Sequence, residues 1–345
     1  MGKAALIVVI GLSITLGFFR FILLQRPVEA TMNTSKYFSL VTAKNVAHSA
    51  TNNYLKKLYQ NKSLRGSFAE SDAYINGGID TVRITSSSSV TSLGDTVNVS
   101  VVAYYGGEKS ELEVTLIASS LTIPPVTASV AFPGPNPVLD LNGSPLIDGA
   151  NHDYNGNPSA SCEDLPGVAV ASSADSANMV NSLISSKMDS KVKGIGADPS
   201  VHVRDTQDPS TYLQPLIANA DYYTPPGTYS SIEFGSQESP VIVYGTGDLK
   251  FSGGVVGHGI LIIDGTLTLS GNFFWYGVVY VIGETPEIFN SVGTNRIVGG
   301  VVLGGSDKIA RLKGTADIQY SCETVENVMN NTNSLITFAL VSWYE

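Results

Sequence analysis

The sequence is poor in charged side chains. Asp, Glu, Lys and Arg make up only 14% of its 345 residues, against roughly 25% in an ordinary soluble domain. The formal net charge is −10, and the basic residues form no dense cluster. The electrostatic attraction that drives nucleic-acid binding is therefore missing. We expect no nucleic-acid partner.

The signatures of common catalytic sites are missing too. There is no G-x-S-x-G, H-E-x-x-H or P-loop motif in the chain, which argues against the enzyme classes that depend on them. The histidines are scattered, and none pairs with another at metal-ligand spacing. They are His48, His152, His202 and His258. We expect no enzymatic activity and no cofactor.

Cysteine is scarce, with only Cys162 and Cys322 in the chain. Two thiols so distant in sequence are a poor basis for a zinc site. One disulfide between them would close a loop of 160 residues and would add about 4–5 kcal/mol of stability on the chain-entropy model. We favour this bridge over two buried free thiols, because the N-terminal segment points to an oxidising compartment.

Hydrophobic and small residues take the place of charge. Hydrophobic residues make up 43% of the chain, and 34 residues are Gly. This content suffices for a packed core and excludes global disorder. The mixture is typical of short strands joined by tight turns, as in secreted all-β proteins.

The N-terminus carries a long apolar run. Residues 4–24 are apolar or nearly so, apart from Arg20, and this length is enough to cross a bilayer as a helix. We predict a transmembrane anchor over residues 1–26, which would place the body of the chain in the periplasm or outside a bacterial cell. The alternative is a cleaved signal peptide that ends at Val28-Glu29-Ala30.

An amphipathic helix is predicted directly after the anchor, over residues 27–66. Residues 32–65 contain no Pro and no Gly, and their apolar positions recur mostly every three or four residues. Pro27 would mark a bend between the two helical parts. The apolar stripe consists of Leu40, Val41, Ala43, Ala47, Ala50, Tyr54, Leu55 and Leu58.

Two regions of different character follow. Residues 67–120 alternate between apolar and polar side chains, which predicts a three- or four-stranded antiparallel sheet with one face on the preceding helix. Residues 121–172 are rich in Pro, Gly and Asn and predict an irregular connector. Residues 173–193 predict a helix that begins near Ser173 or Asp175 and ends at Gly194.

Short apolar runs bounded by Gly recur between residues 240 and 321. The runs that contain Ile260, Val278 and Val301 are spaced by 18 and then 23 residues, which is typical of one turn of a parallel β-helix with glycines at its corners. We predict a right-handed, parallel β-helix-like domain over residues 173–345, with a β-sandwich as the alternative. A helix at residues 322–331 and a strand at 335–343 would cap the coil and return to the body.

Several segments of the sequence resemble a known family. They are MGKAALIVVIGLSITLG at residue 1, TAKNVAHSATNNYL at 42, IDGANHDYNG at 147, LPGVAV at 165, and GHGILIIDGTLTLSGNFFWYGVVYVIG at 257. These segments resemble PilX-type proteins of type IV pilus assembly, which are minor-pilin-like surface proteins with a Gly-rich β-solenoid body. The resemblance implies a membrane- or pilus-associated protein whose body faces the periplasm or the exterior, with pilus or secretion-machinery proteins as partners.

Two positions depart from the standard pilin pattern. Lys3 follows Gly2, where pilins continue with a hydrophobic helix, and Ile7 stands where pilins have a Glu. These differences argue against peptidase processing and against the usual charge pairing. A simply anchored protein of a related envelope system is the alternative.

The segment 148–157 groups oxygen-bearing side chains near glycines. Asp148, Asp153 and Asn155 are candidate ligands for Ca²⁺, which prefers several oxygen ligands. The spacing does not match an EF-hand, because Ser159 stands where the closing Glu belongs. This mismatch favours an Asx-rich turn that satisfies its own backbone.

Two further groups of residues are candidate functional sites. Asp248, Asp264 and Asp317 lie on or beside the predicted coil strands and are the first carboxylates to consider for glycoside cleavage, although turn aspartates are the simpler interpretation. The run 273–276 is aromatic. It is either a surface platform for a sugar or partner, or a strand with Phe273 and Trp275 inside.

The function that these features favour is structural. We expect a membrane-anchored, extracytoplasmic component of a type IV pilus-like or related envelope assembly. The two alternatives are a polysaccharide-active β-helix enzyme and a surface adhesin that binds glycans or a partner.

Overall fold

The chain folds into two compact units. The computed structural model describes residues 2–74, 77–86, 94–121, 123–332 and 335–345. Unit 1 consists of residues 1–119 with 337–345, and unit 2 of residues 120–336. Unit 2 is therefore an insertion between two segments of unit 1, whereas the sequence predicts five consecutive parts.

Unit 1 begins with one long helix, α1 (Gly2–Gln60), of 59 residues. The helix is continuous through Pro27. Among its described side chains, burial begins at Ser39, and Ala43, Ala47 and Leu58 are then fully shielded. The second half of α1 thus packs against the sheet, as the apolar stripe predicts.

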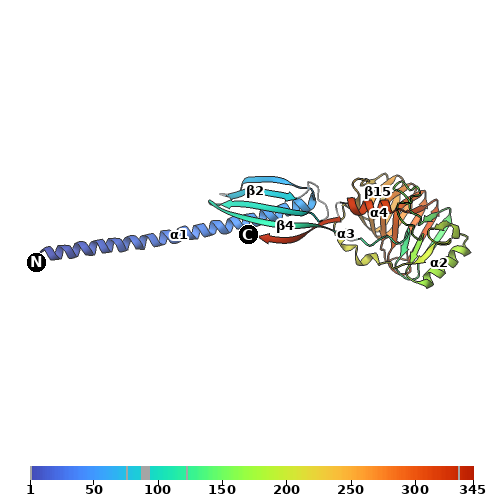
Figure 1. The fold of residues 1–345 in the computed structure, drawn as a ribbon, viewed down its shortest axis with the longest axis horizontal. Coiled ribbons are helices and arrows are strands. Elements are labelled where there is room, and N and C mark those ends of the chain that lie inside the picture. The colour runs from blue at the N-terminus through green and yellow to red at the C-terminus, as the bar shows by residue number, and fades with distance from the viewer. Residues whose placement is uncertain (1, 75–76, 87–93, 122, 333–334) are drawn as a thin grey trace. The chain divides into compact units, whose positions relative to one another are not determined.

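The sheet of unit 1 has five strands in the order β1-β2-β3-β4-β21. They are β1 (Gly66–Tyr74), β2 (Gly77–Ser86), β3 (Thr96–Tyr105), β4 (Glu108–Ser120) and β21 (Ile336–Tyr344). The first four pair antiparallel in chain order, which confirms the predicted antiparallel sheet (Figure 1). In β3, Val97, Val99 and Val101 are buried while their neighbours are more exposed, because alternate side chains of a strand point to opposite faces.

Unit 2 is a coil of parallel strands, which confirms the predicted β-solenoid. Its pairings define three stacks, which we call the first, second and third faces. The first face begins with strands from residues 222–303. They are β11 (Tyr222–Thr224), the start of β14 (Val241–Ser252), the middle of β15 (Val255–Ser270) and the ends of β16 (Phe273–Val281) and β18 (Asn295–Leu303). It continues with three short strands from earlier in the chain: β5 (Val130–Phe132), β8 (Val168–Val170) and β10 (Val201–Val203).

The other two faces continue from the first at each turn. The second contains β12 (Gly227–Tyr229), the ends of β14 and β15, β17 (Glu287–Gly293), β19 (Ile309–Gly314) and β6 (Val138–Gly143). The third contains β13 (Glu233–Phe234), the starts of β15, β16 and β18, then β20 (Asp317–Tyr320), β7 (Leu146–Asp148) and β9 (Val192–Lys193).

Glycines stack at the corners of the coil. Gly259, Gly277 and Gly299 pair in register on successive turns. Gly277 has a φ of +140°, and a Cβ there would fall on the carbonyl oxygen of Gly259. Only glycine fits both the backbone conformation and the close approach of the next turn. The Gly spacing in the sequence therefore reflects the corners of the coil.

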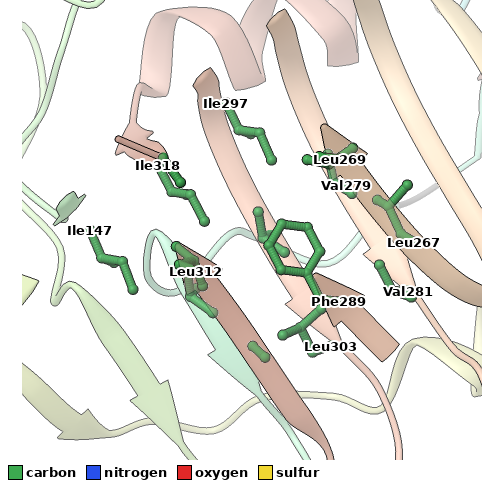
Figure 2. Packing of buried hydrophobic residues seen from close by; sticks show 14 of the residues in the cluster. Ile147, Leu267, Leu269, Val279, Val281, Phe289, Ile297, Leu303, Leu312 and Ile318 are labelled. Carbon is green, nitrogen blue, oxygen red and sulfur yellow. The ribbon is translucent and has the colours of Figure 1, made fainter. Parts of the chain in front are cut away.

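The interior of the coil is a continuous apolar core. Side chains from all three faces meet there, as Figure 2 shows for Leu267, Val279, Phe289, Ile297 and Leu312 among others. Each large side chain buried in this way contributes about 1.5–3 kcal/mol. The strands of the coil therefore enclose their own core and do not need a helix packed on them to cover it.

The order of turns along the coil differs from the order of the sequence. Residues 130–203, the N-terminal coil, and residues 222–320, the C-terminal coil, are wound separately. The last strands of the C-terminal coil pair with the first strands of the N-terminal coil: β18 with β5, β19 with β6 and β20 with β7. We call this contact the seam. The chain thus enters and leaves the stack in its middle, where Leu121 N–H donates to Leu335 O.

A crossing segment joins the two outer ends of the stack. Residues 204–221 run from β10 to β11 and contain η2 (Pro209–Thr211) and α3 (Gln214–Ala218). With α4 (Cys322–Asn331), this segment covers the outside of the first face. The covering cluster includes Leu213, Leu216, Ile260, Val278 and Val328.

The structure differs from two predictions for unit 2. Residues 121–172, predicted as a connector, contribute β5 to β8 to the coil, because strands of only three to six residues suffice once a neighbouring turn supplies their hydrogen bonds. The helix predicted at 173–193 is shorter, α2 (Ser173–Ser185), followed by η1 (Asp189–Lys191). Its N-cap is Ser172, whose hydroxyl accepts from Asp175 N–H.

Candidate functional site

Residues 12–22, in the first half of α1, form an exposed and mostly apolar surface. Leu16, Phe18 and Phe19 are 62, 67 and 66% exposed, and Phe21 and Ile14 are similarly open. Figure 1 shows this part of α1, in blue, extending past the sheet that covers its second half. A contiguous apolar surface of this kind marks an interaction site.

No helix in the described part of the chain is long and apolar enough to span a membrane. The transmembrane prediction for residues 1–26 is therefore not supported. Of the apolar run 4–24, the side chains of residues 12–22 are described, and those of 4–11 and 23–24 lie outside the described side chains.

A second candidate surface is the loop of residues 149–166, which we call the strap. It leaves β7 in the N-terminal coil and reaches across the seam. Asn151 Oδ1 accepts from Cys322 N–H at 3.0 Å, and Glu323 accepts from Tyr154 N–H at 3.1 Å. The Gly156 carbonyl accepts from Arg296 at 3.0 Å. The strap thus holds the C-terminal coil at several points.

The two cysteines lie at the end of the strap and at the start of α4. Cys162 and Cys322 are bonded to each other, so a covalent link spans the seam. The strap belongs to the N-terminal coil, and α4 follows the last strand of the C-terminal coil. The disulfide therefore adds a covalent link between two coils that strand pairing and the strap hydrogen bonds also join.

The three predicted calcium ligands lie at the base and the tip of the strap. Asp153 accepts from both the backbone and side-chain nitrogens of Asn157, and these hydrogen bonds lower the pKa of Asp153. Asp148 accepts from Ala150 N–H, and Asn155 is exposed in the turn. These contacts are those of an Asx turn.

The described residues contain no group of three or more His, Cys, Asp or Glu side chains arranged to hold a metal. The calcium site thus gains no support and stays a prediction.

A partly buried polar cluster lies under the strap. Arg296 Nε is 3.6 Å from Asp317 Oδ2, and His152 Nε2 is 3.8 Å from Asp148 Oδ2. Burial raises the pKa of Asp317, Arg296 and His152 oppose that shift, and Asp148 adds to it. The other oxygen of Asp317, Oδ1, is shielded and has no hydrogen-bond partner among the described residues. Burial therefore has a larger effect on the pKa of Asp317 than the ion pair with Arg296.

Three rings stack on the outside of the third face. The three rings are nearly parallel and contact one another, with centroids 4.9 Å apart for His258 and Tyr276, 5.1 Å for Tyr154 and Tyr276, and 6.0 Å for Tyr154 and His258. The Tyr154 hydroxyl is 2.6 Å from His258 Nδ1. Burial lowers the pKa of His258, opposed by the charges of Glu238 and Glu233. Burial also raises the pKa of Tyr154. These ring contacts anchor the strap to the third face.

The structure decides between the two interpretations of the aromatic run at residues 273–276. Phe273 and Trp275 are fully buried inside the coil, while Tyr276 points outward into the stack with His258. The run is thus a strand with alternating sides, and Tyr276 contacts Tyr154 of the strap.

The predicted carboxylate trio is not brought together. Asp317 lies on the third face, opposite Arg296. Asp264 and Asp248 lie at the corner between the first and second faces, where they pair with Thr246 and Thr266. The described positions therefore place no two of these three carboxylates opposite each other.

The histidines have separate roles. His48 stacks on Trp343 with ring centroids 5.7 Å apart and contacts the Glu345 carboxylate in unit 1. His202 Nε2 is 3.0 Å from Ile195 O. His152 and His258 both lie beside the strap.

Several strap contacts could not be found from the sequence. Glu323, Tyr154 and Arg296 are far apart in the chain, and no spacing links them. His258 and Tyr276 are 18 residues apart, one turn of the coil, and they pair in register. The repeat length alone could therefore have placed these two rings side by side.

No protein-family model matches the chain, and no curated protein matches it. Among solved structures, the chain is similar to the competence-associated pilin ComZ from Thermus thermophilus. The identity is 12%, and the match covers 89% of this chain and 97% of that one, at a TM-score of 0.23. A likeness this low has no weight for fold or function. The resemblance to PilX-type proteins stays a prediction.

Proposed function

We propose that the chain is a structural component of a type IV pilus-like or related envelope assembly. In this proposal the first half of α1 packs against helices of neighbouring subunits, and unit 2 is displayed. The partners are copies of this chain or other pilus or secretion-machinery subunits. The role is structural and needs no cofactor.

One observation supports this proposal most directly. A single helix has a second half packed on a sheet, and in its first half the large apolar side chains described at residues 12–22, such as Leu16 and Phe19, are open to solvent. Exposed apolar surface is costly unless a partner covers it. Since the helix is continuous, a partner bound to its first half is rigidly connected to the sheet.

The compartment is part of the same proposal. Disulfides persist in oxidising compartments and are rare in the cytosol of most bacteria, so the bond between Cys162 and Cys322 favours a location outside the cytoplasm. We place unit 2 in the periplasm or at the cell surface, with the first half of α1 at the inner membrane or within the assembly.

The test is a pull-down of the full chain from cross-linked cell envelopes. The variant is Leu16→Gln with Phe19→Gln, and the control is Val138→Gln with Tyr223→Gln, two exposed apolar positions in unit 2. We expect pilus or secretion subunits with the native chain and with the control. Because each apolar side chain is worth about 1.5–3 kcal/mol when buried, recovery with the variant should fall more than tenfold.

Two results would contradict the proposal. One is equal recovery of these subunits with the variant and the native chain. The other is a native chain that captures no envelope subunit and is recovered only on glycan, which would favour the adhesin alternative.

A further inference from the structure

A cavity of about 180 Å³ lies on the outer side of the first face. Its floor contains Tyr280, Val302 and Ala131, which come from β16, β18 and β5 on successive turns. The floor therefore crosses the seam. Its walls come from residues 124–127, where the chain enters the coil, and from residues 205–207 and 212 of the crossing segment.

The size of this cavity suits one six-membered ring. A buried cavity of about 150 Å³ is known to hold a benzene molecule. The apolar part of the lining includes Val126, Ala131 and Val302, which can contact the faces of a ring. A larger molecule would have to extend outward past the walls.

The polar part of the lining calls for a ligand with hydroxyl groups. The Thr206 hydroxyl is shielded from solvent and has no hydrogen-bond partner among the described residues. The Tyr212 and Tyr280 side chains lie against each other, and burial raises the pKa of Tyr212 to about 12. The Tyr212 hydroxyl thus keeps its proton at neutral pH, so it can both donate and accept a hydrogen bond.

Charge at the cavity excludes some ligands. Asp205 lies at the wall, and no lysine, arginine or histidine occurs among the described residues that line it. An anionic ligand would face this carboxylate without a cation to pair with. A benzene-like ring would leave the Thr206 hydroxyl unpaired, which costs about 1–3 kcal/mol. A neutral ring that both donates and accepts hydrogen bonds fits best.

We propose that this cavity binds a single neutral pyranose ring or a cyclic polyol of the same size, with Thr206 and Tyr212 as its hydrogen-bonding residues. The ligand would contact residues from both coils and from the segment that enters them. This site is separate from the first half of α1, so it can be tested independently of the proposed assembly role.

The test uses the full, disulfide-bonded chain and three probes: methyl α-glucoside, myo-inositol and phenol. Saturation-transfer NMR titrations report binding. We expect saturable binding of methyl glucoside or inositol. Thr206→Val, which removes a hydroxyl but keeps the shape, should weaken it roughly three- to tenfold, the value of one neutral hydrogen bond. Ala131→Leu, which fills the floor, should abolish it.

The matched control is Thr228→Val, at an exposed position on β12, which should bind like the native chain. If Ala131→Leu fails to fold, Thr206→Val alone decides. The proposal is overturned if neither hydroxylated probe binds saturably, if phenol binds more tightly than both, or if Thr206→Val and Thr228→Val bind equally well.

Discussion

The two units build their cores in opposite ways. Unit 1 has an antiparallel sheet whose first four strands pair in chain order, and it needs α1 to cover its apolar face. Unit 2 has parallel strands that enclose their own core, so its helices only cover or cap the outside. Unit 1 therefore depends on one helix, whereas unit 2 depends on the fit of each turn to the next.

A tryptophan in each unit allows this comparison to be measured. The chain has two tryptophans. Trp275 is fully buried in the coil, and Trp343 lies on β21 against His48 of unit 1. With Trp343→Phe or Trp275→Phe as background, the fluorescence of the remaining tryptophan reports one unit during urea unfolding.

The largest effect should come from Gly277→Val. The new side chain would meet the Gly259 carbonyl, in a backbone conformation that β-branched residues avoid. We expect the folded signal of Trp275 to be lost in water while that of Trp343 persists. The control is Gly253→Asn, because Gly253 has a φ of +53° and nothing within 4 Å of an added Cβ. A folded Gly277→Val coil would refute the stacking argument.

Removal of the disulfide should have the next largest effect. Cys162→Ser with Cys322→Ser frees a loop of 160 residues, and we expect the free energy of unfolding of unit 2 to fall by about 4–5 kcal/mol. The measurement is the urea midpoint of the Trp275 signal. The Trp343 midpoint serves as the internal control, and an equal loss at both tryptophans would show that the units do not unfold separately.

Leu58→Ala tests the dependence of unit 1 on α1. Leu58 is fully buried between helix and sheet, and such truncations cost about 2–5 kcal/mol. The Trp343 midpoint should fall accordingly, with the Trp275 midpoint unchanged. Leu340→Ala, at a position 59% exposed on β21, should change neither. If Leu58→Ala leaves the urea midpoint of the Trp343 signal unchanged, the core between α1 and the sheet is contradicted.

The smallest effect concerns the cluster under the strap. The pKa of Asp317 is raised in the folded state, so folding favours its protonated form. Its contribution to stability is complete below the unfolded pKa of about 4 and is lost as pH rises through the folded value. Asp317→Asn should therefore stabilise unit 2 at pH 7.

The prediction for Asp317→Asn can be checked by repeating the measurement at acid pH. The stabilisation by Asp317→Asn should shrink as pH falls below about 4, since the native Asp317 is then neutral as well. Urea midpoints of the Trp275 signal at both pH values measure it. A variant that is less stable than the native chain at pH 7 would show that the pairing with Arg296 outweighs burial.

Much of the fold could be predicted from the sequence where its pattern is local. The Gly-bounded runs at 18- and 23-residue spacing identified the C-terminal coil, because each turn repeats the same corners. The alternation in residues 67–120 identified the antiparallel sheet for the same reason. The aromatic strand at Phe273 and Trp275 followed from its two-residue period.

The rest of the fold depends on contacts between residues far apart in the chain, and such contacts produce no periodic pattern in the sequence. Strands β5 and β8 have three residues each, too few to show alternation among the prolines and asparagines around them. Their partners lie in distant parts of the chain, as in the pairing of Val301 with Val130. The seam, the strap and the cavity wall at Thr206 all arise from this order of turns, and a reading along the chain could not reveal it.

The seam also determines how the coil would respond to tension. The coil continues into the rest of the chain only near residues 120 and 336, and both connections join it in the middle of the stack. A pull along the chain between these points reaches the bond from Cys162 to Cys322 once β5, β6, β7 and the strap have been extended. The sulfur–sulfur bond then carries the load, and the 160-residue stretch between the two cysteines is spared. The coil is in this respect a mechanically protected insert that can give way at its middle without unravelling from either end.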